Sequence, residues 1–173
     1  DDLYDELLMF AGFATVGDVM DLTGENRILV REGLKRLQKT THPGMSALIE
    51  ANELARDTLS AFHIGFVLGP CINASGRLAT AKRALALLDT KDQALAIERA
   101  AELKELNDER KELTEQGLAQ AVDLIEHSDL MEDRVLVVYL PDCHESLAGI
   151  IAGRIRERYY RPVFVLTRAE DGV

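Results

Sequence analysis

The stretch Gly69-Pro70-Cys71-Ile72-Asn73-Ala74-Ser75-Gly76-Arg77 lies between two segments whose apolar residues recur at helical spacing. Pro70 favours the end of any helix that arrives from upstream, and the small polar residues after it suit turns. Arg77 adds a planar guanidinium with five donors, which suits an oxyanion such as phosphate. The pattern predicts a loop that either binds phosphate or forms a helix–loop–helix corner with a surface arginine.

Apolar residues at intervals of three and four predict a mostly helical protein on both sides of this loop. Gly12 is expected to close the first helix, and the longest helix is expected to connect two parts of the protein. The predicted helices cover residues 2–12, 27–38, 45–54, 58–68, 79–88 and 92–126.

Towards the end of the sequence the pattern changes to a strand, a helix and a second strand. Residues 135–140 and 163–166 are continuous apolar runs, which are typical of strands buried on both faces. A strand–helix–strand order of this kind predicts a parallel βαβ unit. Ligands of such units bind beyond the carboxyl ends of the strands, where His144 would lie at the start of the connecting helix.

The composition limits the classes of function. The 173 residues are 47% hydrophobic and carry a formal net charge of −10, which argues against a surface that coats polyanions in general. Aromatic residues make up 5% of the chain and tryptophan is absent, so no stacking platform for single-stranded nucleic acid is obvious. The two cysteines, Cys71 and Cys143, are expected to be reduced thiols of a cytoplasmic protein without a membrane span.

Two further features leave alternatives open. Asp18 lies in an otherwise apolar segment, where an unpaired carboxylate is costly, so it either caps a turn or meets a cation. The predicted helix at 27–38 carries a basic face that includes Arg27, Arg31 and Lys35. This face is either a solvated surface or a stripe that follows phosphates.

Three stretches in this order resemble a known family. The first is Thr15–Val19 together with Glu25–Leu29, the second is Gly69–Arg77, and the third is His144–Arg154 followed by Tyr160–Val163. Together they are similar to the RecJ-type exonucleases of the DHH phosphoesterase superfamily, which degrade single-stranded DNA from its 5′ end. The resemblance spans nearly the whole chain.

The resemblance implies a longer protein with two lobes, of which this chain is a central piece. Residues 1–24 would end the DHH phosphoesterase domain, and residues 25–128 would form a helical connecting region that includes the Gly69–Arg77 stretch. Residues 129–173 would begin the DHHA1 domain. The implied fold class is α/β, mostly helical in this piece and followed by the βαβ start of the second lobe.

The resemblance also implies roles for four residues. Asp18 matches a metal ligand of the catalytic cleft, which binds Mn²⁺ or Mg²⁺ in the intact enzyme. Asn73 and Arg77 match positions that face DNA phosphate, and His144 matches a histidine on the substrate side. The implied partner is single-stranded DNA, with other DNA-repair proteins as further partners of a monomeric, cytoplasmic enzyme of DNA repair and recombination.

The chain departs from the family pattern in ways that affect function. The aspartate-rich first motifs and the Asp-His-His signature are absent, so we expect the piece alone to be inactive. Cys71 stands where the family usually has arginine, which removes one expected phosphate contact. Two other functions stay open: an oligoribonuclease or cyclic-dinucleotide phosphodiesterase of the same superfamily, and a non-catalytic helical interaction module.

Overall fold

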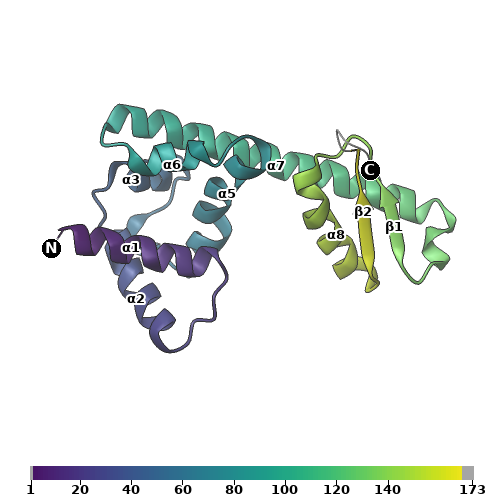
Figure 1. The fold of residues 1–173 in the computed structure, drawn as a ribbon, viewed down its shortest axis with the longest axis horizontal. Helices are drawn as coiled ribbons and strands as arrows, with labels where there is room; N and C mark the ends of the chain where they lie inside the picture. Colours follow the sequence, from purple (N-terminus) through teal and green to yellow (C-terminus); the bar gives the residue numbers. More distant parts are fainter. Residues whose placement is uncertain (1, 169–173) are drawn as a thin grey trace. The chain divides into compact units, whose positions relative to one another are not determined.

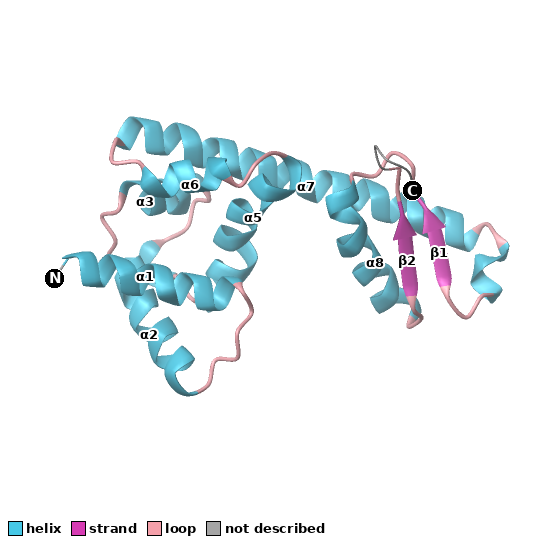
Figure 2. Ribbon diagram, viewed as in Figure 1, coloured by secondary structure: helices cyan, strands magenta, loops and turns pink. Residues whose placement is uncertain are grey.

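The computed structural model describes residues 2–168, so the last five residues of the predicted segment 129–173 lie outside the described part. As predicted, the fold is mostly helical and ends in a small parallel sheet (Figure 2). The elements are α1 (Asp2–Gly17), α2 (Gly24–Gln38), α3 (Pro43–Ala51), η1 (Arg56–Thr58), α4 (Ala61–His63), η2 (Ile64–Leu68), α5 (Gly69–Leu78), α6 (Lys82–Asp89), α7 (Gln93–Glu126), η3 (Asp129–Glu132), β1 (Leu136–Tyr139), α8 (Glu145–Tyr159) and β2 (Val163–Leu166).

The chain forms two compact units, Asp1–Asn107 and Asp108–Val173. The division falls inside α7, a single helix of 34 residues that begins in the first unit and ends in the second (Figure 1). The predicted long helix is therefore confirmed. Neither α7 nor any other helix within residues 2–168 is long and apolar enough to cross a membrane.

Helices α1 and α2 pack closely through two glycines. A Cβ atom on Gly33 would lie 2.9 Å from the Cα of Gly12 and from the carbonyl oxygen of Leu8, so only glycine fits there. The prediction that Gly12 closes the first helix is wrong, because α1 continues to Gly17. Gly12 does not end a helix; it allows the backbones of α1 and α2 to approach each other closely.

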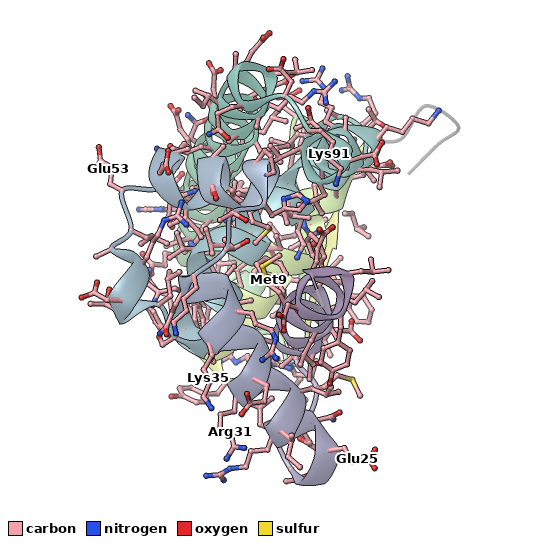
Figure 3. All side chains as sticks on the ribbon, turned by 90° about the vertical axis from the view of Figure 1, so that its left-hand side faces the viewer. Met9, Glu25, Arg31, Lys35, Glu53 and Lys91 are labelled. Atoms are coloured by element: carbon pink, nitrogen blue, oxygen red, sulfur yellow. The ribbon has the colours of Figure 1, made fainter. Side chains whose placement is uncertain are left out.

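The hydrophobic core of the first unit is built by α1, α2, α3, η2, α5, α6 and α7, together with Leu59. Met9 of α1 is 2% exposed and lies at the centre of the view in Figure 3, among the helices. Ala96, Ala100 and Leu103 of α7 close the core. The other buried members are Leu37, Met45, Ala47, Leu48, Ile49, Leu59, Ile64, Leu68, Cys71, Ala84 and Leu87.

The second unit contains the predicted βαβ arrangement. Strands β1 and β2 are parallel, with Leu136 opposite Val163 and Tyr139 opposite Leu166, and α8 connects them. One face of the sheet packs on the buried side of α8, whereas Val137, Tyr139, Phe164 and Leu166 are exposed on the other face. The expectation that both faces are buried is wrong for residues 2–168, because the described helices cover only one face.

Candidate functional site

The stretch Gly69–Arg77 is helical, so the prediction of a loop is wrong. Residues 61–78 form one continuous helical run in which α4, the π-helical turn η2 and α5 follow one another without a break. Pro70 lies in the first turn of α5, where its missing N–H is tolerated. The small polar residues of this stretch, which favour turns in isolation, lie here within the helix, some on its exposed face and some on its buried face.

The π-helical turn explains how the helix continues past Pro70. The N–H of Gly69 donates to the carbonyl oxygen of Ile64, five residues earlier. This wider turn moves the preceding backbone away from the proline ring, which would clash with a carbonyl in a regular α-helix. A Cβ on Gly69 would lie 2.7 Å from that same oxygen of Ile64, so glycine is required at this position.

Helix α5 has one buried and one exposed face. Cys71, Ala74 and Ser75 point into the core, and the Cys71 thiol donates to the Oδ1 atom of Asn52 at 3.6 Å. Asn73 and Arg77 are both exposed and four residues apart, so they lie on the same side of the helix. The structure thus brings together the two residues predicted to contact phosphate and turns Cys71 away from them.

Asp18 lies at the C-terminal end of α1, in a tight backbone turn. The Met20 N–H donates to Thr15 O at 3.1 Å, and the Val19 N–H donates to Val16 O at 3.0 Å. These two bonds form a Schellman motif with Val19 in the left-handed region at φ 56°. A β-branched residue is strained in that conformation. The strain sits directly beside the predicted metal ligand.

The Asp18 carboxylate is exposed and makes no side-chain hydrogen bond to the described residues. It therefore does not cap the turn, and its place at a helix C-terminus is unfavourable for a negative charge. Within residues 2–168 no three His, Cys, Asp or Glu side chains gather as a metal site. The described residues therefore do not provide a set of three such ligands for a divalent ion.

The end of α1 lies beside the π-helical turn. Val16, two residues before Asp18, has its Cγ1 atom 3.7 Å from the position of a Cβ on Gly65. The helix end that carries Asp18 and the helical run that carries Asn73 and Arg77 are thus neighbours in the first unit.

His144 lies in the second unit, as the N-cap of α8. Its Nδ1 atom accepts from the Ser146 N–H at 3.2 Å and lies 2.8 Å from the Ser146 hydroxyl. In the neutral ring, the proton is therefore on the exposed Nε2 atom, which can donate to a ligand. The adjacent Cys143 is partly buried, and burial raises the pKa of its thiol. Cys143 is not an activated nucleophile.

The basic face of α2 is partly neutralised by two neighbouring carboxylates, Glu32 and Asp5. Lys35 and Arg31 contact Glu32 at 2.9 and 3.0 Å, and the hydrogen bond from Lys35 is the main cause of a lowered Glu32 pKa. A hydrogen bond to Asp5 at 2.6 Å raises the pKa of Arg36. Arg31 and Lys35 extend from α2 into solvent (Figure 3). These contacts favour a solvated face over a phosphate-following stripe.

Known proteins resemble this chain over nearly its whole length, although no protein-family model matches it. The single-stranded-DNA-specific exonuclease RecJ of Salmonella typhimurium is 40% identical over 172 residues, which is 96% of this chain. The chain is therefore similar to a part of RecJ. It spans 30% of the length of that RecJ relative.

Solved RecJ structures share the fold. The crystal structure of RecJ from Thermus thermophilus in complex with Mg²⁺ matches 94% of the chain with a TM-score of 0.83 and 35% identity, which covers 25% of that protein. A structure of exonuclease RecJ bound to manganese matches 92% of the chain with a TM-score of 0.79 and 37% identity, which covers 40% of that protein.

Sequence reasoning missed an aromatic pair next to the site. Phe62 and Phe66 are exposed, and their rings stack with centroids 4.9 Å apart. The pair was missed because the low overall content of aromatic residues argued against any stacking surface. The spacing of four residues within a predicted helix was the signal that places two side chains side by side.

The π-helical turn predicts different costs for two nearby glycine substitutions. Gly69→Ala should lower the free energy of unfolding by about 1–3 kcal/mol, because its Cβ would overlap the Ile64 carbonyl oxygen. Gly65→Ala is the matched control, because its Cβ would meet only Val16 Cγ1 at an ordinary 3.7 Å. Urea denaturation measures both values. Equal stability of the two variants would contradict the π-helical turn.

Strain at Val19 predicts a stabilising substitution beside Asp18. Val19→Gly should raise the free energy of unfolding by about 1 kcal/mol, because glycine adopts the left-handed region without steric cost. Met20→Gly, one residue further and without a positive φ, should instead lower it by about 0.5–1 kcal/mol. Denaturant midpoints of the two variants should therefore move in opposite directions, and a loss of stability in Val19→Gly would refute the strain.

Proposed function

We propose that this chain is part of a metal-dependent exonuclease that hydrolyses single-stranded DNA in repair and recombination, from the 5′ end. The observation that carries the proposal is the exposed face of α5, where Asn73 and Arg77 lie one helical turn apart on the helical run that contacts α1 through η2. Support comes from the RecJ relatives, whose names describe the same specificity for single strands.

Arg77 and Asn73 would hold a phosphate of the strand. A guanidinium donates two parallel hydrogen bonds to a phosphate, and an amide N–H four residues earlier adds a neutral donor on the same side of the helix. The core packing of Cys71, Ala74 and Ser75 fixes the rotation of α5 and therefore the direction of both side chains. The protein thus orients the phosphate before the reaction, which lowers the entropic part of the barrier.

Asp18 would contribute one ligand to a divalent cation that the remainder of the protein also holds. Such a cation, Mn²⁺ or Mg²⁺, supplies an activated water and neutralises charge on the phosphate. An exposed carboxylate without a side-chain hydrogen bond to residues 2–168 fits this role, and the strained Val19 follows it directly. Because no three potential metal ligands gather within residues 2–168, we expect the 173-residue piece alone to lack nuclease activity.

His144 would act on the substrate side in the second lobe, through its Nε2–H. Its Nδ1 atom is held by the Ser146 backbone, so the ring is oriented before any ligand arrives. On this proposal residues 1–24 end the DHH domain, residues 25–128 form the helical connector, and residues 129–173 begin the DHHA1 domain. The enzyme would work as a cytoplasmic monomer with other DNA-repair proteins as partners.

Arg77→Ala in the intact protein should weaken binding of a single-stranded oligonucleotide and flatten its dependence on salt. Loss of one phosphate contact reduces the slope of log K against log salt by about 0.7 for a single strand. The rate of cleavage should fall by about a hundredfold, because the phosphate loses its orientation. Fluorescence anisotropy at several salt concentrations and a nuclease assay with Mn²⁺ measure these effects.

Arg31→Ala is the matched control for this test. Arg31 is an exposed arginine in the same unit, but it lies on α2 and not on α5. We expect its affinity and salt slope to equal those of the unmodified protein. If Arg31→Ala flattens the slope and Arg77→Ala does not, the basic face of α2 binds the strand and the proposed role of α5 is wrong.

A further inference from the structure

Phe62 and Phe66 form an aromatic step on the surface of the first unit. Their side chains are 61% and 70% exposed, although each is a large apolar group. The rings stack with centroids 4.9 Å apart and planes inclined by 28°. Phe62 and His63 also form a T-shaped contact, at 5.8 Å between ring centroids. The pair of phenylalanines therefore presents an exposed aromatic surface to its surroundings.

The aromatic step lies on the same side of the helical run as the proposed phosphate contacts. Phe62, Phe66, Asn73 and Arg77 follow one another at intervals of four, seven and four residues, which return to one face of a helix. All four are exposed, whereas Ile64, Leu68, Cys71 and Ser75 between them are buried in the core. The exposure pattern shows that one surface runs from the rings to the guanidinium.

The length of this surface suits a nucleic-acid strand. Fifteen residues separate Phe62 from Arg77, which corresponds to roughly 22 Å at about 1.5 Å per helical residue. At the spacing of about 3.4 Å per nucleotide in a stacked strand, this distance covers about six nucleotides. A strand whose phosphates meet Asn73 and Arg77 would therefore reach the aromatic step within a few nucleotides.

We propose that Phe62 and Phe66 stack with unpaired nucleobases of the strand whose phosphates contact Asn73 and Arg77. This inference rests on the proposed function and adds to it a base-contacting subsite. Stacking of bases on aromatic side chains tolerates any sequence, because every base has a π face. Bases of a duplex are paired and stacked on one another, so their faces are closed to the rings. The step would thus favour single strands without reading sequence.

The aromatic step could instead pack against an apolar surface of another protein. Substitution of both rings by leucine distinguishes protein packing from base stacking. Leucine retains apolar area for packing against protein but has no π face for a base. Replacement of both rings by leucine should therefore preserve a protein contact and remove base stacking. Replacement by tyrosine should preserve stacking.

The test measures binding of the intact protein, without divalent cation, to an oligonucleotide of normal bases and to one with consecutive abasic sites. The unmodified protein should bind the abasic strand at least about fivefold more weakly, the lower end of what one aromatic–base stack contributes. The double variant Phe62→Leu with Phe66→Leu should bind the normal strand at least about fivefold more weakly and lose its preference over the abasic strand. The salt slope should not change, because no phosphate contact is removed.

Two further variants act as controls. Phe164→Leu removes a ring that is 60% exposed on the sheet of the second unit, and it should leave affinity and the abasic preference unchanged. Phe62→Tyr with Phe66→Tyr should retain both. Circular dichroism verifies folding, and the abasic preference of the unmodified protein tests the inference even where a variant does not fold.

The outcomes separate this inference from the proposed function. If the intact protein cleaves single strands but shows no abasic preference, or if the leucine variant retains that preference, the rings do not stack with bases and the inference is overturned. If the intact protein does not cleave single-stranded DNA with Mn²⁺ or Mg²⁺, the proposed function itself fails.

Discussion

The close approach of Gly69 to the carbonyl oxygen of Ile64 sets the geometry on which the candidate site depends. The π-helical turn that this contact permits allows one helical run to pass through Pro70, and it fixes the rotation of α5 relative to the preceding helix. With that rotation, Cys71 and Ser75 enter the core while Asn73 and Arg77 face outwards. In a regular α-helix the proline ring would clash with a carbonyl of the preceding turn, and the helix would end there. Asn73 and Arg77 would then no longer be held on one surface. π-helical turns are frequent at functional sites for this reason.

A second local constraint lies next to the first. Helix α1 ends in a Schellman motif that holds Val19 in a left-handed conformation, and the exposed Asp18 carboxylate precedes it. Val16 packs near Gly65 in the π-helical turn, so the two constrained segments support one another. Strain of this kind persists only where surrounding structure determines it, and it is concentrated at functional sites. The candidate site therefore consists of two rigid backbone features that place polar groups at the surface.

Periodicity and composition predicted much of the fold and part of the site. Helical spacing identified the long α7, and the two apolar runs identified the parallel βαβ unit, because these signals extend over many residues. The π-helical turn could not be predicted, since Pro70 and its small neighbours favour a loop locally and only core packing reverses that preference. The helix end predicted at Gly12 was wrong, because in the sequence a glycine at a helix–helix contact cannot be distinguished from a glycine that ends a helix. The left-handed conformation of Val19 and the exposure of Phe62 and Phe66 depend on backbone angles and burial, which sequence patterns do not report.

The central claim is that the exposed face of α5 contacts the phosphates of a single DNA strand. Its most direct test is a crystal structure of the intact protein with a single-stranded oligonucleotide and Ca²⁺ in place of the activating ion. The account predicts the Arg77 guanidinium at about 2.7–2.9 Å from phosphate oxygens, the distance of a charge-assisted hydrogen bond, with the Asn73 amide on the same stretch of backbone. A strand that is fully ordered in the complex but passes α5 without contacting either residue would contradict it.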